Sequence, residues 1–473
     1  MTRILLAACL LTSTAPVAAQ PLPTPTPATS SKPLYLPTVP HEVAALRDRA
    51  LEDDYAWDIV EGLTTEIGQR LGGTSAEARA RDWAVAKLKA MGFSNVRVER
   101  FAMPVWTRGT EAVEVLAPFP QKLVATAFGN SASTSAAGVE GEVVGFDTLA
   151  DLMAAPDAAV RGKIVFISHA MPRTQDGSGY GFFGGPRRQG PSIASRKGAL
   201  AVVVRSIGTD HHRNPHAGGQ TFEDGVAPIP AAALAIPDAE QLSRILRRGK
   251  PVTMRLTLVS TVRSGDSGNV IAEVPGRDPN APILLVGGHL DSWDLGTGAI
   301  DDGAGVAIAT AAAKQVMNAG RPLRTIRVVW FGAEEMGLYG GRFYKDLHGN
   351  EPHYAIAESD FGADRIWKVD SKLGKPREAE ARALQAALAP LGIVPGSIEA
   401  ADGSDIGPMI EAGLPAVGLS QDGTHYFDIH HTPDDTLDKI DPEQLRQNVA
   451  AWSAMLAVLS GGIETEPKPG KRR

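Results

Sequence analysis

The stretch from His289 to Glu335 constrains the fold most, because it places an imidazole and carboxylates directly after buried strands. The run Pro282–Gly287 is apolar without interruption and ends in glycine. This pattern is typical of a strand buried on both faces of a largely parallel sheet. His289 and Asp291 follow it, at the carboxyl end of the strand, where ligands bind in open α/β sheets. The stretch therefore predicts an α/β fold with a functional site at this edge.

Two pairs of adjacent carboxylates follow the same plan. Asp301 and Asp302 precede the alanine-rich stretch 306–317, which predicts a helix, and Glu334 and Glu335 follow a second apolar strand. Taken alone, either pair would be interpreted as a capped helix N-terminus. Carboxylates with one imidazole per metal suit Zn²⁺, and of two adjacent carboxylates one can bind metal while the other acts as a base. Three such clusters at one sheet edge favour a two-metal hydrolase.

Length and charge narrow the class of protein. The chain has 473 residues, which exceeds one ordinary core and predicts two domains plus tails. Hydrophobic residues make up 43% and the formal net charge is −7, as in a soluble globular protein without the basic excess that nucleic-acid binding requires. We therefore expect no nucleic-acid partner.

The N-terminus predicts export. Residues 1–3, 4–11 and 17–19 have the charged, apolar and small-residue regions of a secretory signal, with cleavage after Ala19. The apolar region is too short to span a bilayer, and no other stretch is apolar enough to do so. The secreted or periplasmic chain would lack cysteine, because Cys9 is the only one, and so would need no disulfide. A lipoprotein cleavage box ending at Cys9 is the alternative.

Composition divides the rest of the chain. Residues 20–40, rich in proline, threonine and serine, predict a disordered linker. In residues 117–263, short valine-rich strands alternate with glycine- and proline-rich loops, which predicts a mostly β module. This module would be inserted into an α/β domain made of residues 41–116 and 264–463. Residues 464–473 would form a disordered tail.

Three further motifs have ordinary structural interpretations. The glycines of 177–185 lack the strand and helix context of a nucleotide-binding loop and predict a mobile loop. His211, His212 and His216 predict a histidine-rich surface loop that could line a substrate cleft, in preference to a metal site. The peptide 265–268 matches the nucleophile peptide of trypsin-like proteases without its His and Asp context, so we interpret it as a turn at the domain junction.

The order of motifs resembles the zinc peptidases of the aminopeptidase and glutamate-carboxypeptidase superfamily, most of all their carboxypeptidase Q (plasma glutamate carboxypeptidase) group. The residues that carry the resemblance are Gly288-His289-Leu290-Asp291, Asp301-Asp302, Ala333-Glu334-Glu335, Glu358-Ser359-Asp360, Gly403-Ser404-Asp405 and His430-His431-Thr432. The resemblance implies a mixed, largely parallel sheet flanked by helices, the zinc-exopeptidase fold, with an inserted protease-associated domain. It also implies a homodimer.

Carried over by position, the resemblance implies a set of five ligands for two zinc ions. Asp301 would bridge both ions. His289 and Asp360 would complete one site, and Glu335 and His431 the other. The peptide bond after Asp301 would be cis. Two such metal ions, about 3.5–4 Å apart, activate a shared water and polarise the scissile carbonyl.

The resemblance also implies catalytic roles for Glu334 and Asp291. Glu334, which binds no metal, would take the proton of the attacking water and pass it to the leaving amine. Asp291 would accept the free ring N–H of His289 and fix its tautomer. Where some relatives have a tyrosine before the last histidine ligand, this chain has His430. His430 or Tyr426 could therefore donate to the oxyanion, and a packing role for either is the alternative.

The resulting prediction is an exported di-zinc exopeptidase that acts on short peptides or dipeptides, as an aminopeptidase or dipeptidase. We place Asp294, Ser404 and Asp405 near the substrate. A carboxypeptidase is the first alternative, since the sequence alone identifies no arginine for a free carboxylate. A non-catalytic binding homologue and a one-zinc acyltransferase of the glutaminyl-cyclase kind are the others, and metal stoichiometry would discriminate between them.

Overall fold

The computed structural model describes residues 36–399, 401 and 403–464. The predicted signal peptide, residues 20–35 of the predicted linker and residues 465–473 of the predicted tail lie outside the described residues. The described residues from Pro37 to Glu464 form one compact unit. The last described residue, Glu464, pairs with Arg321 in a two-stranded ribbon and so is not part of a tail.

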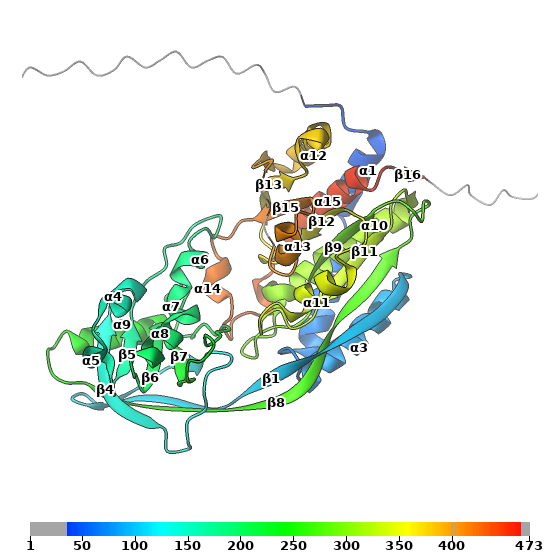
Figure 1. The fold of residues 1–473 in the computed structure, drawn as a ribbon. Helices are drawn as coiled ribbons and strands as arrows, with labels where there is room; N and C mark the ends of the chain where they lie inside the picture. The colour runs from blue at the N-terminus through cyan, green and yellow to red at the C-terminus, as the bar shows by residue number, and fades with distance from the viewer. Residues whose placement is uncertain (1–35, 400, 402, 465–473) are drawn as a thin grey trace, which may run out of the picture. The chain divides into compact units, whose positions relative to one another are not determined.

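Helices and strands alternate along most of the chain (Figure 1). The helices are α1 (His41–Ala50), α2 (Tyr55–Gly62), α3 (Ser75–Ala90), α4 (Leu149–Ala154), α5 (Asp157–Val160), α6 (Tyr180–Phe183), α7 (Gly185–Arg188), α8 (Gly190–Arg196), α9 (Ile236–Leu246), α10 (Ala304–Ala319), α11 (Tyr339–His348), α12 (Glu378–Leu388), α13 (Gly407–Glu411), α14 (Tyr426–Ile429) and α15 (Pro442–Leu459). The strands are β1 (Ser94–Ala117), β2 (Gln121–Leu123), β3 (Ala125–Ala127), β4 (Val139–Phe146), β5 (Ile164–Ile167), β6 (Ala201–Arg205), β7 (Ala231–Leu234), β8 (Thr253–Val274), β9 (Ile283–His289), β10 (Arg321–Pro322), β11 (Ile326–Phe331), β12 (His353–Glu358), β13 (Ile366–Lys372), β14 (Val394–Pro395), β15 (Ala416–Gln421) and β16 (Ile463–Glu464).

The centre of the sheet is parallel and carries the predicted site. Strands β11, β9, β12 and β15 are parallel neighbours, whereas β8 and β13 join them antiparallel. Leu284 and Val286 of β9 pack into the same core cluster as the alanines of α10 and the apolar face of α15, whereas Leu285 packs on the other side with Tyr344 of α11. Alternate residues of one strand are therefore buried on opposite faces, which explains its continuous apolar run. The expected mixed, largely parallel sheet flanked by helices is confirmed.

The inserted segment 117–263 has its own small α/β arrangement. Strands β4, β5, β6 and β7 are parallel neighbours, and helices α4 to α9 all fall within this fully described segment. It therefore contains more helix than the expected mostly β module. The stretch 177–185, predicted as a loop, contains α6 and the start of α7. Glycine-rich helices as short as these leave no periodic signal in a sequence.

Two long antiparallel strands, β1 and β8, run through both parts of the chain (Figure 1). The peptide Gly265–Gly268 lies in the interior of β8, paired with residues 100–103 of β1, so the predicted turn is wrong. A Cβ at Gly268 would lie 2.9 Å from the backbone oxygen of Glu99. The glycine there permits the close approach of two strands and does not reverse the chain. The predicted domain boundary at 263/264 consequently falls inside a strand.

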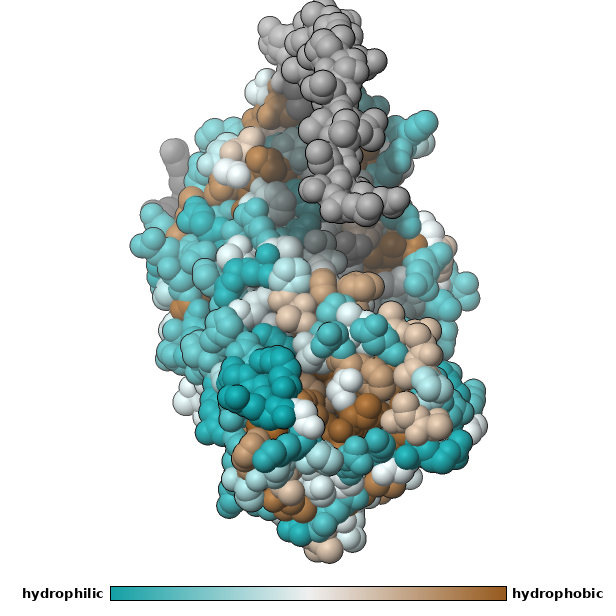
Figure 2. Space-filling model, turned by 90° about the vertical axis from the view of Figure 1, so that its left-hand side faces the viewer, coloured by the Kyte–Doolittle hydropathy of each residue, from teal (hydrophilic) through white to brown (hydrophobic). Residues whose placement is uncertain are grey.

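The surface in Figure 2 is largely hydrophilic, with one hydrophobic area in its lower half. In the part of the chain that the structure describes, no helix has the length and apolar character needed to cross a bilayer.

Candidate active site

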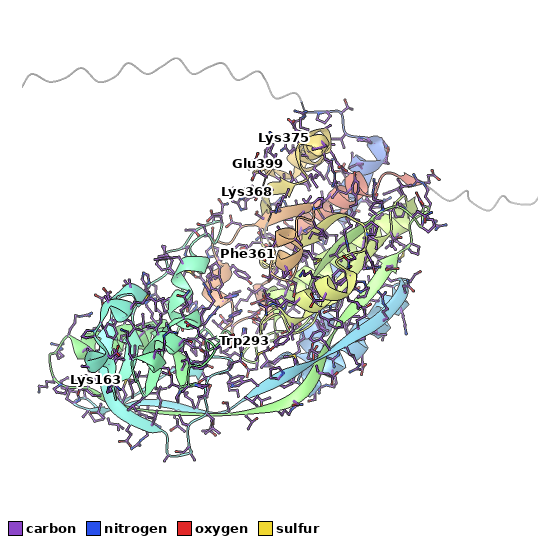
Figure 3. The ribbon with its side chains drawn as sticks, viewed as in Figure 1. Lys163, Trp293, Phe361, Lys368, Lys375 and Glu399 are labelled. Carbon is purple, nitrogen blue, oxygen red and sulfur yellow. The ribbon has the colours of Figure 1, made fainter. Side chains whose placement is uncertain are left out.

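The predicted ligands meet at one edge of the parallel sheet. His289 is the last residue of β9, and Glu334 and Glu335 follow β11. Asp360 follows β12, the other neighbour of β9. Because parallel strands end at the same edge, their following residues converge there. Trp293 and Phe361, labelled in Figure 3, come from the loops after β9 and β12.

Asp301 lies at the centre of this group. His289 Nε2 is 3.0 Å from Asp301 Oδ1 and 3.5 Å from Asp360 Oδ1. On the other side, His431 Nε2 is 3.1 Å from Asp301 Oδ2 and 3.1 Å from Glu335 Oε2. Burial opposes the ionisation of Asp301, but hydrogen bonds from the two imidazoles outweigh it and hold its pKa well below the ordinary value. The five residues implied as metal ligands therefore lie close together. Asp301 contacts both His289 and His431, so it lies between the two expected metal sites.

Asp302, next to Asp301, has a different environment. Its carboxylate accepts the backbone N–H of His289 (2.9 Å) and that of Gly305 (3.0 Å), so both of its oxygens are occupied. Asp302 thus lies just before α10, accepts an N–H of the first turn of this helix and fixes the backbone of His289. The peptide bond between Asp301 and Asp302 is cis, as the resemblance implied.

Asp291 contacts the site differently from the prediction. His289 Nδ1 lies 2.9 Å from the backbone oxygen of Asp291, while the Asp291 carboxylate is 3.6 Å away. That carboxylate instead accepts the backbone N–H groups of Glu334 (3.0 Å) and Glu335 (3.3 Å). The side chain thus holds the turn after β11, where Ala333 has a φ of 56°. A strained residue at such a turn needs support of this kind.

Glu334 faces the cavity next to Asp301 and Glu335. Burial, the largest cause, raises the pKa of its carboxyl well above the ordinary value, and the neighbouring acids add to this. A carboxyl group with a raised pKa holds its proton more tightly, so its ionised form is a stronger proton acceptor.

His430 and Tyr426 both line the cavity. The His430 ring stacks on His431 with 3.5 Å between centroids, and its Nε2 lies 3.4 Å from Asp301 Oδ2. His430 Nδ1 is buried and has no hydrogen-bond partner. Burial lowers the pKa of His430, and repulsion from His431 lowers it further. The structure thus adds a third imidazole to the two that the resemblance implied as ligands.

The three residues that were expected near the substrate have different environments in the structure. Ser404 lines the cavity. Asp294 does not, because it is held by Arg108, whose guanidinium makes two hydrogen bonds to it at 2.8 and 2.9 Å. Asp405 is fully buried and accepts the backbone N–H of Gly341. Neither Asp294 nor Asp405 is among the residues that line the cavity, and sequence spacing does not show which acids already have partners.

The cavity has a volume of about 980 Å³ and is lined by both parts of the chain. The peptidase part contributes the ligand group and α11. The inserted segment contributes Tyr180, Arg187, Arg188 and the stretch 219–221. Gly219 approaches so closely that a Cβ there would lie 2.9 Å from the backbone oxygen of Glu335. The inserted segment therefore forms a wall of the site.

Sequence reasoning missed the residues that support the last ligand loop. His216 is buried, with Nε2 2.9 Å from Asp210 Oδ1 and Nδ1 2.9 Å from the backbone oxygen of His430. Ala217 donates its N–H to the backbone oxygen of His431 at 2.8 Å. His216 is thus not part of a surface loop. No spacing signal distinguishes it from the exposed neighbours beside it.

Arg70 and Asp435 support the loop before Asp301 and were also missed. Arg70 is fully buried and donates to the backbone oxygens of Leu290 (2.6 Å) and Gly298 (2.8 Å). The Asp435 carboxylate accepts the backbone N–H groups of residues 299 and 300, each at 2.8 Å. Asp435 lies three residues after the quoted motif His430-His431-Thr432, so it could have been found. Nothing in the sequence around Arg70 shows that it is buried.

The side chains of the group fit metal ions. Three carboxylates and two imidazoles converge, and such a donor set suits zinc. Glu335 Oε1 is buried without a hydrogen-bond partner, which is costly unless a cation satisfies it. Three trios have ligand atoms close enough to share an ion: Asp301, His430 and His431; His289, Asp301 and Glu335; and His289, Asp302 and Asp360.

Comparisons with known proteins agree with this geometry. Residues 269–456 match the model of peptidase family M28. Carboxypeptidase Q of Bos taurus is 34% identical over 415 residues, covering 86% of this chain and 85% of the relative. Carboxypeptidase Q of Homo sapiens is 33% identical over 410 residues, with 86% and 85% covered.

Solved structures share the fold. A peptidase M28 precursor from Shewanella amazonensis SB2B is 45% identical, with a TM-score of 0.86, and 91% of this chain and 98% of that chain are covered. An aminopeptidase from Aneurinibacillus sp. strain AM-1 is 23% identical, with a TM-score of 0.62 and 92% and 99% covered, which shows likeness of fold alone. The chain therefore belongs to peptidase family M28, and it is a zinc exopeptidase with two zinc ions as its cofactors.

Proposed function

We propose that the chain is an exported exopeptidase that hydrolyses short peptides, either by removing an N-terminal residue or by splitting dipeptides. The observation that carries the proposal is the group centred on Asp301, which opens into the cavity beside Glu334. This group provides donors for two metal ions, and the carboxylate of Glu334 lies beside them. The carboxypeptidase Q relatives support peptide hydrolysis from a chain end.

In this proposal Asp301 would hold both zinc ions, His289 and Asp360 would complete one site, and Glu335 and His431 would complete the other. Zinc ions bound there would supply a Lewis acid that lowers the pKa of a water molecule and polarises a carbonyl. Asp302 fixes the backbone of His289 and takes no part as a ligand, because its two oxygens are occupied by backbone N–H groups.

Glu334 is the proton carrier of the reaction. Its side chain faces the cavity and is free of the ligand positions, so it can accept the proton of the attacking water and return it to the leaving amine. Asp291 acts as a positioning residue through the backbone of Glu334 and Glu335. We assign oxyanion donation to His430, since its Nε2 faces Asp301; Tyr426 is the alternative donor from the same cavity.

Export, the domain division and assembly belong to the proposal as well. The signal-like residues 1–19 support a secreted or periplasmic location. The segment 117–263 forms a wall of the cavity and would be a protease-associated domain that shapes access to it. A homodimer follows from the resemblance alone.

The test is hydrolysis of an unblocked dipeptide and of its N-acetylated form by the zinc-loaded protein, with and without a chelator. We expect chelator-sensitive cleavage of the unblocked dipeptide. Cleavage only of N-acetylated peptides would move the assignment to a carboxypeptidase, the activity in the name of the carboxypeptidase Q relatives. Lack of cleavage of either form would favour a binding homologue, and one bound zinc per chain would favour an acyltransferase.

A further inference from the structure

The parallel strands β5 and β6 of the inserted segment end in polar residues on one face of the sheet. In β5, Phe166 belongs to the same core cluster as Leu242 of α9, and Ser168 comes two residues later. In β6, Val203 belongs to this cluster too, and Arg205 comes two residues later. Because alternate side chains of a strand point to the same face, Ser168 and Arg205 lie on the side that α9 covers.

Helix α9, which lies beside β5 and β6 (Figure 1), forms the opposite side of this edge. Its buried face includes Leu242, and next to that face Glu240, Arg244 and Arg247 form a stripe at every third or fourth position. These three residues line a pocket of about 320 Å³ together with Ser168, Arg205 and Ser243. Small ligands bind at the carboxyl ends of strands in open α/β sheets, in pockets of about 300–1,000 Å³. None of these six residues lines the active-site cavity, so the pocket is a separate candidate site.

Positive charge exceeds negative charge in this pocket. Three arginines and a single acid, Glu240, line it. Glu240 Oε1 is 3.3 Å from Arg205 Nη2, and Glu240 Oε2 is 3.9 Å from Arg244 Nη1, so two guanidinium groups share one carboxylate. Arg247 forms no ion pair with any residue that the structure describes. The pocket therefore has donors and charge that the fold itself does not use.

Arg205 is the most enclosed of the three arginines. Its side chain is 12% exposed, against 52% for Arg244, and its Nη1 is buried without a hydrogen-bond partner in the described chain. Burial lowers the pKa of Arg205, although Glu240 and Asp210 favour the charged form. A buried N–H without an acceptor is costly unless a ligand supplies one. This atom distinguishes the pocket from an ordinary solvated stripe of arginines.

We propose that this pocket binds a phosphate group, either of free phosphate or of a lipid headgroup. The donors belong to two strand ends and a helix, so they surround the pocket from different elements. A phosphate group has acceptor oxygens in several directions, whereas a carboxylate has two oxygens in one plane, and arginine pairs well with phosphate. The pocket is separate from the peptidase chemistry, so its test does not depend on the proposed function.

The experiment is a calorimetric titration of the zinc-loaded protein with inorganic phosphate at low salt, where screening is weak. Because zinc also binds phosphoryl oxygens, the wild type should show two binding events, one at the metal site and one at the pocket. Arg205→Gln should weaken only the pocket event, by about 10- to 100-fold, because it removes charge-assisted hydrogen bonds. Arg247→Gln should weaken the same event by about tenfold.

The matched control is Arg248→Gln. Arg248 follows Arg247 directly and is exposed, but it does not line the pocket. This variant should bind phosphate as the wild type does. If it weakens the pocket event as much as Arg247→Gln does, general surface charge attracts the phosphate and the inference is wrong. A titration that none of the variants changes would place all binding at zinc and would also overturn it.

Two further measurements test the variants and the ligand class. The unfolding midpoint shows whether Arg205→Gln is folded; if it is not, the comparison of Arg247→Gln with Arg248→Gln decides. Acetate replaces phosphate in a second titration. We expect acetate to bind the pocket at least about tenfold more weakly, because it has fewer acceptor oxygens. Equal binding of acetate and phosphate would refute the preference for a phosphate group.

Sedimentation with lipid vesicles distinguishes the two sources of phosphate. The vesicles consist of phosphatidylcholine with or without phosphatidic acid, which has an exposed phosphate group. Sedimentation with phosphatidic acid that Arg247→Gln abolishes and Arg248→Gln does not would support a lipid headgroup. Pocket binding of inorganic phosphate without such sedimentation would support free phosphate. Binding of neither ligand at the pocket would refute the inference.

Discussion

Neighbouring acids of the same type have different roles in this active site. The backbone around each acid determines whether its carboxylate faces the metal ligands, the cavity or backbone N–H groups. Asp302 has both oxygens filled by N–H groups, whereas Asp301 faces two imidazoles. Glu335 lies against His431, whereas Glu334 faces the cavity. Sequence could identify the pairs, because carboxylates after strands are visible in it. Only the resemblance and the structure distinguish the members within each pair.

Replacing Glu334 separates proton transfer from metal binding. Glu334→Gln removes the proton acceptor but no ligand, so zinc content should stay at the wild-type level while kcat falls by about 10²- to 10⁴-fold. The measurement is elemental analysis of zinc beside steady-state hydrolysis of a dipeptide. Loss of zinc from this variant would contradict the role proposed for Glu334.

Replacing Asp301 should remove zinc, whereas replacing Glu334 should not. Asp301→Ala removes the one carboxylate that faces both halves of the site, so both zinc ions should be lost or bound far more weakly. Equilibrium dialysis with zinc checks this. Asp438→Ala, at an exposed acid that pairs with Lys439 and does not line the cavity, is the control and should retain two ions. Two tightly bound ions in Asp301→Ala would refute the bridging role.

At the scale of elements, the loop with the last ligand depends on the inserted segment. His216 bridges Asp210 and the backbone of His430, and Ala217 binds the backbone of His431. The sequence showed three histidines close together, and composition correctly described the exposed His212 but not the buried His216. Burial of a loop residue depends on which distant segment covers it, and a local pattern contains no such information.

His216→Ala should therefore weaken metal binding without removing a ligand. We expect zinc affinity to fall by about 10- to 100-fold, as for other residues that orient metal ligands. Competition with a chelator of known affinity measures this. His212→Ala is the matched control, because the His212 side chain is 64% exposed, and it should keep the wild-type affinity. Equal affinities in the two variants would show that the contact with His430 is dispensable.

For the whole molecule, the sequence predicted the central sheet but not how the two parts are joined. The apolar runs of β9 and β11 and the alanine-rich stretch of α10 have strong local signals, and they were predicted. Strand β8 was divided into a strand and a turn, because its middle, around residues 260–268, is polar, glycine-rich and partly exposed. Pairing with β1 over this stretch keeps it extended, and such long-range pairing has no local signature.

Because β1 and β8 run through both parts, we expect the described chain to unfold in one cooperative transition. All seven tryptophans lie outside residues 117–263, so their fluorescence reports mainly the peptidase part, although Trp106 and Trp293 contact Ser131 and Gly129 of the inserted segment. Leu256, fully buried in the half of β8 that lies in the inserted segment, provides the test. Leu256→Ala should lower the free energy of unfolding by about 2–5 kcal/mol.

The destabilisation should appear in the tryptophan midpoint during denaturant unfolding, although the substitution is in the other part of the chain. Amide exchange in β5 and β9 should accelerate together. Val262→Ala, on the same strand at a side chain with 65% exposure, should change stability by no more than about 0.5 kcal/mol. A tryptophan midpoint that does not move in Leu256→Ala, with faster exchange in β5 alone, would mean that the two parts unfold independently despite their shared strands.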